Sequence, residues 1–312
     1  MHGDLAPEHC RVIDAVVFMG SKAAGLLLCE TVCQLFPGNL AAIICPDDSQ
    51  DARSVLPGFR SLAERHGVPL KVVATRADTL RWLDYYQARL AFVHGWYQII
   101  PVDGPCDFYG FHYSSLPQYR GNAPLVWQII NGEPAIGVSF FRFSERMDEG
   151  LLVGQASVAL DSDETIGDAL EKANALMLEL AARYMPEVVG GVVKLYPQPN
   201  EDASYCGLRR PEDGLIDWRA SAERVHDFIR AQTHPYPGAY TQVEGGGVLR
   251  VWRCALEPRR FYGVPGSVVE VSAEWVVVAC GEGAVRLLII ALDGAAEVSA
   301  PQVLRSLKTR LI

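Results

Sequence analysis

The residues of this sequence best suited to move a proton are His112 and Asp148. His112 ends an apolar and aromatic run and stands just before an SSLP turn. Asp148 follows a second strand-like run and precedes a Glu-Gly pair. A histidine changes its charge near neutral pH, and a neighbouring carboxylate stabilises its charged form. If their two loops meet, the pair predicts acid–base chemistry. Without further evidence, a histidine at the end of an apolar run is more often a core residue bonded to a carbonyl, and this interpretation also applies to His112.

The elements that would position this pair follow an α/β pattern, because strand-like and helix-like segments alternate over the first hundred residues. We predict strands at 12–19, 40–45, 70–74 and 90–95 and helices at 22–35, 58–66 and 79–83. This pattern is typical of a doubly wound, mostly parallel sheet, which binds ligands beyond the carboxyl ends of its strands. The turn at 20–25 lacks the spacing of a phosphate-binding loop, so we interpret its glycines as turn residues.

The rest of the chain changes in character after a long amphipathic helix predicted at 165–184, which Pro186 or Gly190-Gly191 should kink or end. The proline-spaced stretch 196–205 is the best linker candidate. Beyond it we predict a helix at 222–231, strands at 239–243, 248–255, 266–271, 275–280 and 284–292, and a closing helix at 301–310. The domains are therefore predicted as 1–200 and 205–312, the second a small β-rich, barrel-like domain that completes the fold or mediates a homodimer.

The charge of the chain argues against nucleic acid as a partner. Residues 1–200 hold 15 basic and 23 acidic side chains and residues 201–312 hold 13 and 14, so neither part has a basic excess and the net charge is −9. A protein that grips many phosphates needs a basic face. A small or modestly anionic substrate fits better.

The eight cysteines include no CxxC pair, so we predict buried or incidental thiols of a reducing compartment and no zinc or other metal site. No apolar stretch of about 18 residues is present, which predicts no membrane span. The first residues have no apolar run of the kind found in secretion signals. We expect a cytoplasmic protein.

Four stretches of this sequence resemble one known family. They are HYSSLPQYRGNAPLVWQIINGE, GWYQIIP, RMDEGLLVG, and RRPEDGLIDW together with HPYPGAY. They are similar to the motifs of the 10-formyltetrahydrofolate-dependent formyltransferases, the group of methionyl-tRNA and aminosugar N-formyltransferases. The resemblance covers most of the chain, with the best specificity from 95 to 155. It implies a Rossmann-like formyltransferase domain followed by a smaller β-rich domain.

The resemblance also implies roles for individual residues. His112 would handle the proton of the attacking amine, and Asp148 would stabilise its charged form. The folate co-substrate would be held by a further set of residues: Gln98, Ile99 and Ile100 at the pterin, and Asn122 with Ser144, Glu145, Arg146 and Met147 in the rest of the pocket. Without the resemblance, plain core packing would be the better interpretation of Ile99 and Ile100.

Gly110 is where the sequence departs from the family, which usually carries an asparagine two residues before the histidine. That asparagine is thought to donate a hydrogen bond to the oxyanion, and loss of one such donor costs on the order of a hundred- to a thousandfold in rate. Three interpretations stay open. In the first, formyl transfer persists because the missing donor is replaced by Tyr113, Ser114, Asn122 or a water. In the second, the site performs another one-carbon or acyl reaction. In the third, the protein binds a folate or metabolite without catalysis. Under the first, Gly110→Asn should leave or raise activity.

The acceptor is predicted to be the amine of a small biosynthetic intermediate, such as an aminosugar nucleotide or an amino-acid-derived metabolite. Transfer to methionyl-tRNA is the less favoured alternative, because the second domain has almost no net charge. Its two arginine pairs, at 209–210 and 259–260, are of the kind usually found on solvated surfaces.

Overall fold

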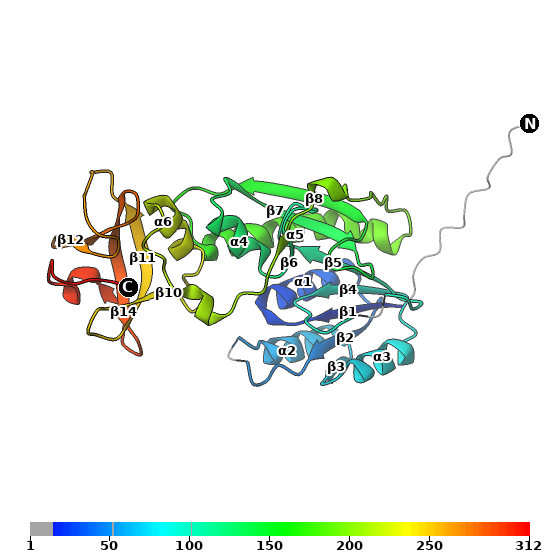
Figure 1. The fold of residues 1–312 in the computed structure, drawn as a ribbon. Coiled ribbons are helices and arrows are strands. Elements are labelled where there is room, and N and C mark those ends of the chain that lie inside the picture. Colours follow the sequence, from blue (N-terminus) through cyan, green and yellow to red (C-terminus); the bar gives the residue numbers. More distant parts are fainter. Residues whose placement is uncertain (1–14, 52, 101) are drawn as a thin grey trace, which may run out of the picture. The chain divides into compact units, whose positions relative to one another are not determined.

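The structure is a computed structural model, and it describes residues 15–51, 53–100 and 102–312. The described chain forms two compact units (Figure 1). The first comprises the residues up to Arg120 together with Gly137–Ser157 and Ala173–Ser204; the second comprises Gly121–Ile136, Val158–Lys172 and Tyr205–Ile312. The two units therefore interleave along the chain.

The first unit is built on a seven-stranded sheet of order β3-β2-β1-β4-β5-β7-β8. Its strands are β1 (Val16–Gly20), β2 (Leu40–Pro46), β3 (Leu70–Val73), β4 (Leu90–His94), β5 (Asp107–His112), β7 (Ala135–Arg142) and β8 (Leu152–Ala159). The pairs from β3 to β5 are parallel and β5 pairs with β7 antiparallel. The central strands β1 and β4 are apolar except for His94 at the end of β4, as expected where helices cover both faces of a sheet.

The helices of this unit confirm the doubly wound, Rossmann-like arrangement. They are α1 (Lys22–Leu35), α2 (Leu56–His66), α3 (Arg76–Tyr85) and α5 (Ile166–Val189) from Ala173 onward. Phe59 of α2 packs on Phe18 on one face of β1, whereas Leu83 of α3 joins the cluster on the other face. Both α2 and α3 are longer than predicted. The predicted strand at 12–19 is seen from Val16 onward, and residues 12–14 lie outside the described part.

Helix α5 continues past Pro186, which was predicted to kink or end it, and stops at the predicted glycines. Met185 and Val188 are both buried, so packing holds the helix on each side of the missing N–H. Gly191 has φ 67°, and the Val192 N–H bonds the Glu187 carbonyl 3.0 Å away. A left-handed glycine thus closes the helix.

The second unit contains an antiparallel sheet, in agreement with the predicted β-rich domain. Its strands are β10 (Ala239–Gln242), β11 (Val248–Leu256), β12 (Val268–Val271), β13 (Val276–Ala279), β14 (Ala284–Leu292) and the short β15 (Val298–Ser299), with helices α4 (Pro124–Ile130) and α6 (Ala222–Arg230) in the same unit. The order is β10-β11-β14-β13-β12, with β15 on β14. Trp218, Val251 and Leu287 lie in the core of the sheet.

The closing helix predicted at 301–310 is wrong. Only a short 3-10 turn forms at Ala300–Gln302, and the chain end is extended. There the Ile312 N–H bonds Gln242 at the end of β10, the Leu311 N–H bonds Gly266, and the Val268 N–H of β12 bonds Thr309. The segment 309–312 therefore links both edges of the sheet and makes it barrel-like. The backbone groups of the two edge strands need hydrogen-bond partners, and satisfying them stabilises the extended segment more than a helix would, despite the helical spacing of its apolar residues.

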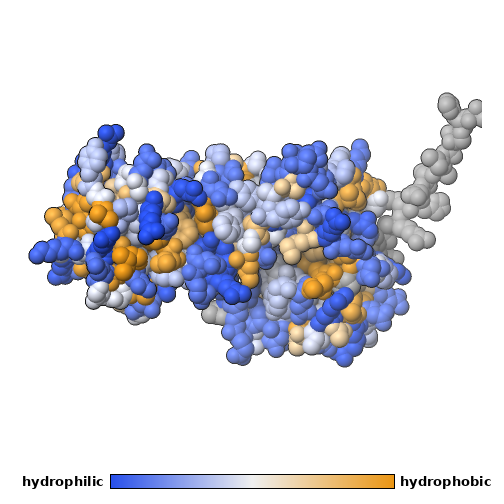
Figure 2. All heavy atoms as spheres, viewed as in Figure 1, coloured by the Kyte–Doolittle hydropathy of each residue, from blue (hydrophilic) through white to orange (hydrophobic). Residues whose placement is uncertain are grey.

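On the face shown in Figure 2, exposed apolar side chains form separate orange groups. None of the helices in the described part of the chain is long and apolar enough to cross a membrane. The seven cysteines of the described part are free thiols, most of them buried. Cys10 lies outside the described residues.

Candidate active site

His112 is the last residue of β5, at the carboxyl edge of the parallel part of the sheet. Its side chain is 9% exposed, and its Nε2 lies 2.7 Å from the Tyr119 carbonyl oxygen. A carbonyl accepts hydrogen bonds and does not donate them, so Nε2 carries the proton. Nδ1 is then the nitrogen that can take up a second proton.

Asp148 faces that nitrogen, as the sequence predicted. Its Oδ2 lies 3.6 Å from His112 Nδ1, which is an ion-pair distance and longer than a hydrogen bond. Both side chains are largely shielded from water, so the carboxylate acts on the imidazole with little screening. The pair can hold a proton at Nδ1 and stabilise the resulting charge.

The loop that carries Asp148 is held by its backbone. Gln198 Nε2 donates to the carbonyl oxygens of Asp148, at 2.8 Å, and Gly150, at 2.7 Å. Asp148 itself has φ 56°, a conformation that a non-glycine residue adopts only when its surroundings favour it. At Gly150 a Cβ atom would overlap the Arg142 carbonyl. These contacts place the carboxylate opposite His112.

Arg120 is a fully buried cation in the same unit. Its guanidinium donates to Gln198 Oε1, at 2.8 Å, and to Asn200 Oδ1, at 3.2 Å, and it lies 3.5 Å from the Glu149 carboxylate. A buried charge is tolerated only when it is paired and hydrogen-bonded in this way. Arg120 therefore ties the loop of His112 to the loop of Asp148.

The stretch predicted as a linker is an integral part of this unit up to residue 204. Besides Gln198 and Asn200, Ser204 accepts a hydrogen bond from the Tyr119 N–H at 2.9 Å, and Tyr196 exchanges backbone hydrogen bonds with Leu152. Sequence reasoning missed Gln198 and Ser204, because a glutamine and a serine among prolines follow no pattern that indicates a site.

Gly110 lies on the same strand as His112, two residues before it, and is tightly enclosed. A Cβ atom at this position would lie 2.7 Å from Cε1 and Cζ of Phe143 and 2.7 Å from the Val93 carbonyl oxygen. Gly110 does not have a positive φ, so space rather than backbone conformation excludes a side chain. A side chain at this position would have to displace the Phe143 ring and the Val93 carbonyl, which argues against the expectation that Gly110→Asn leaves or raises activity.

Two of the predicted substitute donors are already used. The Tyr113 hydroxyl donates to Asn174 Oδ1 at 2.6 Å, and the Ser114 hydroxyl donates to the Gln118 carbonyl at 2.6 Å. A hydroxyl has one proton to donate. Neither group can serve an oxyanion without giving up its present bond.

The residues predicted to hold a folate differ in their surroundings. Ile99 is 79% exposed, whereas Ile100 packs against the core cluster of the first unit. Core packing, the interpretation favoured without the family, thus applies to Ile100 and not to Ile99. Within the described part of the chain, Gln98 Oε1 is buried and has no hydrogen-bond partner.

The other predicted folate residues lie in two places. Ser144, Glu145, Arg146 and Met147 form the exposed stretch before Asp148. Ser144 Oγ donates to the Arg146 carbonyl at 3.0 Å, so the stretch carries its own turn. Asn122 belongs to the second unit, where its N–H bonds the Cys206 carbonyl.

His94, at the end of β4, is a polar residue that the sequence did not single out. Its ring lies 5.3 Å from the Tyr113 ring, and its Nδ1 is buried without a hydrogen-bond partner among the described residues. Burial, together with the nearby His112, lowers the pKa of His94 to about 4. His94 is therefore a neutral imidazole at physiological pH.

The glycine-rich turn after β1 does not present a free cation. Lys22 is bonded to Asp48 at 2.5 Å and to Asp51 at 2.9 Å, so two carboxylates already occupy its ammonium group. This agrees with the interpretation of the turn as structural. Within the residues that the structure describes, no three His, Cys, Asp or Glu side chains gather in a way that would hold a metal ion.

Two family models match most of this sequence. One, described as formyl transferase, matches residues 52–189, and the other, described as formyl transferase C-terminal domain, matches residues 209–308. The first includes His112 and Asp148.

Solved structures share the fold at low identity. A variant of HypX from Aquifex aeolicus is 18% identical with a TM-score of 0.63, covering 94% of this chain and 47% of that one. This chain thus spans about half the length of HypX. WlaRD, a sugar 3N-formyl transferase solved with dTDP and 5-N-formyl-THF, is 17% identical with a TM-score of 0.66 and coverages of 89% and 98%. An N-formyltransferase from Helicobacter canadensis, in complex with folinic acid and dTDP-3-aminofucose, is 17% identical with a TM-score of 0.65 and coverages of 88% and 98%.

Proposed function

Because this chain belongs to the formyl transferase family, we propose that it transfers a formyl group from 10-formyltetrahydrofolate to the amine of a small biosynthetic intermediate, such as an aminosugar nucleotide or an amino-acid-derived metabolite. The observation that carries the proposal is the pair of His112 Nδ1 and Asp148 Oδ2, 3.6 Å apart at the carboxyl edge of the sheet. Ligands of such sheets bind at this edge.

The residues present fit a folate. The side-chain oxygen of Gln98 is buried and has no hydrogen-bond partner within the described part of the chain, so it can accept a hydrogen bond from a ligand. Ile99 offers an exposed apolar surface. Two of the structures with this fold were solved with a formylated folate or folinic acid. We assign Gln98, Ile99 and Ile100 to the pterin and the 144–147 stretch to the rest of the folate. The bound folate would supply the activated formyl group.

His112 supplies the proton transfer. The acceptor amine loses a proton when its nitrogen bonds to the formyl carbon, and Nδ1 of His112 takes that proton while Asp148 stabilises the imidazolium. The same nitrogen then returns the proton to the folate nitrogen, whose bond to the formyl carbon breaks. The Tyr119 carbonyl keeps the ring in the required tautomer.

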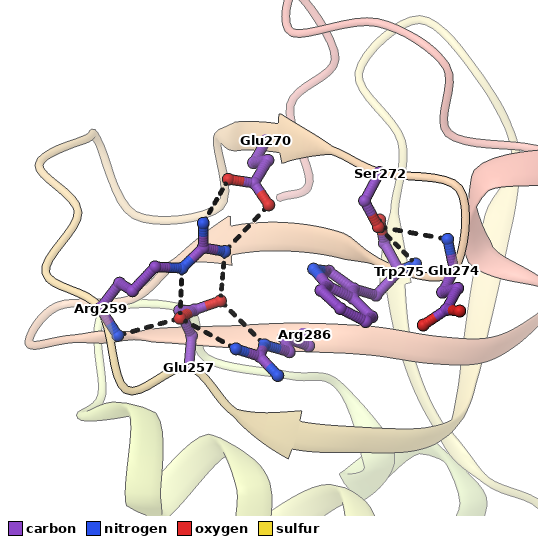
Figure 3. Close-up of polar contacts among 7 residues, drawn as sticks. All are labelled: Glu257, Arg259, Glu270, Ser272, Glu274, Trp275 and Arg286. Atoms are coloured by element: carbon purple, nitrogen blue, oxygen red, sulfur yellow. Dashed lines mark hydrogen bonds and ion pairs between the residues drawn. The ribbon is translucent and has the colours of Figure 1, made fainter.

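A tRNA acceptor is not supported by the surface of the second unit. Figure 3 shows Arg259 between the carboxylates of Glu257 and Glu270, with N–O distances of 2.9 Å, and Arg286 bonded to Glu257 at 2.8 Å. Arg209 lies over the rings of Trp127 and Phe228. These arginines are committed within the unit, so they add little to a basic face.

The proposal is tested by turnover with a panel of aminosugar nucleotides and amino-acid-derived amines. Wild-type protein with 10-formyltetrahydrofolate should produce a formamide, detected by mass spectrometry, and His112→Ala should abolish it. Asp148→Asn should lower kcat by about a hundredfold while leaving folate binding intact. His66→Ala, an exposed histidine on α2, is the matched control and should behave as wild type.

The outcomes separate the alternatives. Folate binding by calorimetry without turnover of any amine would favour a binding protein. Consumption of the folate without a formamide product would favour a different one-carbon reaction at the same site. Equal activity of wild type and His112→Ala would exclude the assigned role of His112.

A further inference from the structure

The ring of Phe143 fills the space where the family resemblance implies the side chain of an asparagine. Phe143 follows β7, and its N–H bonds the Phe108 carbonyl of β5 at 2.8 Å. Its Cε1 and Cζ point at Gly110, since both would lie 2.7 Å from a Cβ at that position. Its ring packs at a tilt against Phe141, with ring centroids 5.0 Å apart, and it contacts two core clusters. The ring is therefore a packed part of the site wall.

Phe143 is also the last anchored residue before the exposed stretch that leads to Asp148. Residues 144–147 are all exposed, and beyond them Gln198 bonds the carbonyls of Asp148 and Gly150 while Arg120 pairs with Glu149. The packing of the Phe143 ring thus fixes the position of one end of this loop, and the hydrogen bonds of Gln198 help to fix the position of the other. Displacement of either end would move the carboxylate away from His112 Nδ1.

We infer that Gly110 and Phe143 form a matched pair, in which the absence of a side chain at 110 admits the aromatic ring that positions the Asp148 loop. Phe143 is then a positioning residue that acts through Asp148, and the wall beside His112 is aromatic in place of an amide. The role in catalysis rests on the proposed function, whereas the packing of the pair does not.

A double-mutant cycle tests the pair. Gly110→Ala should lower the melting temperature by several degrees, because its Cβ overlaps the ring and the Val93 carbonyl. Phe143→Val should also lower it, through the void left by the ring. In the double variant the new Cβ meets a smaller side chain, so its loss should be clearly less than the sum of the two single losses. The Val93 contact remains, so recovery should be partial.

The matched control pairs Gly110→Ala with Phe140→Val. Phe140 is a fully buried aromatic residue of β7 that stacks on Phe111, on the other face of the sheet. Its truncation makes no room at Gly110, and the losses in this pair should add. Additive losses in the Phe143 pair as well would overturn the inference.

Two further readouts separate positioning from general destabilisation. In Phe143→Val, amide hydrogen exchange should speed up at residues 144–148 and not in β1 or β4. If the protein transfers formyl groups, kcat of this variant should fall at least about tenfold while KM for folate and amine stays nearly constant. Unchanged exchange or unchanged kcat would refute the positioning role. Failure to find any turnover would count against the proposed function alone, since melting and exchange still test the pair.

Discussion

The polar groups around His112 divide into those that face its ring, the Tyr119 backbone carbonyl and the Asp148 carboxylate, and those that are bonded elsewhere. Tyr119 and Asp148 hold the two ring nitrogens, whereas the hydroxyls of Tyr113 and Ser114 are bonded to other partners. Gly110 adds no donor and has no room for one. At the scale of single residues, the proposed proton-transfer pair has a partner at each ring nitrogen of His112, and the ring of Phe143 packs against Gly110 on the same strand.

His94 should make the stability of the protein depend on mildly acidic pH. Its pKa is lowered to about 4 in the folded state by burial, against 6.5 in an unfolded chain. The unfolded state therefore binds more protons between these values, so stability is full above about pH 6.5 and is lost as pH falls toward 4. We expect up to about 2 kcal/mol less stability at pH 5 than at pH 7 from this residue.

Urea denaturation at the two pH values measures this effect, and His94→Gln should reduce the difference. His66→Ala, on the surface of α2, should leave the difference unchanged. An equal pH dependence in wild type and His94→Gln would show that His94 is not responsible.

At the scale of elements, two segments without a long helix or strand make contacts that their sequence did not indicate. The stretch 196–204 holds the loops of both His112 and Asp148, through Ser204 and Gln198. The stretch 309–312 pairs with both edges of the second sheet. In each case the backbone and short polar side chains make the contacts, and these leave little trace in hydrophobic periodicity.

Gln198→Ala should lower both activity and stability. The variant removes two hydrogen bonds to the carbonyls of Asp148 and Gly150 and leaves buried Arg120 with fewer partners, at a cost of about 1–3 kcal/mol. We expect kcat to fall more than the affinity for folate, measured by steady-state kinetics and calorimetry. Glu201→Gln, an exposed change in the same segment, is the control. A Gln198→Ala protein with wild-type kcat would contradict the assigned role.

Leu311→Ala should destabilise the second unit by about 2–4 kcal/mol, because this side chain is 1% exposed within the core of the sheet. Thermal unfolding followed by circular dichroism measures the loss. Ile312→Ala is the matched control, since Ile312 is 55% exposed and makes its hydrogen bonds to Gln242 through the backbone. Similar losses in both variants would mean that the core contact of Leu311 is not what closes the sheet.

At the scale of the whole molecule, the net charge of −9 and the pairing of arginines with glutamates in the second unit both disfavour a polyanionic partner. We expect no saturable binding of tRNA at physiological salt in a filter-binding assay. Electrostatic binding would show affinity falling steeply with salt concentration. Micromolar or tighter binding with such a salt dependence would reverse the preference for a small acceptor.

Most of the sheet was predictable from the sequence, because its strands and helices are local patterns. Parallel strands buried on both faces give continuous apolar runs, and helices give a period of 3.6 residues. Each of the strands β1 to β4 and of their helices can therefore be predicted from its own segment of sequence. The placement of His112 at a strand end follows from the same reading. The Asp148 partner was within reach because family motifs surround it.

What only the tertiary structure decided are contacts between residues far apart in the sequence. Whether a side chain fits at position 110 depends on the Phe143 ring and the Val93 carbonyl, and the position of Asp148 depends on Gln198. The last residues of the sequence are extended and not helical because two distant sheet edges need partners. Local periodicity records which face of an element is buried, but space and hydrogen-bond partners at a given point are properties of the assembled chain.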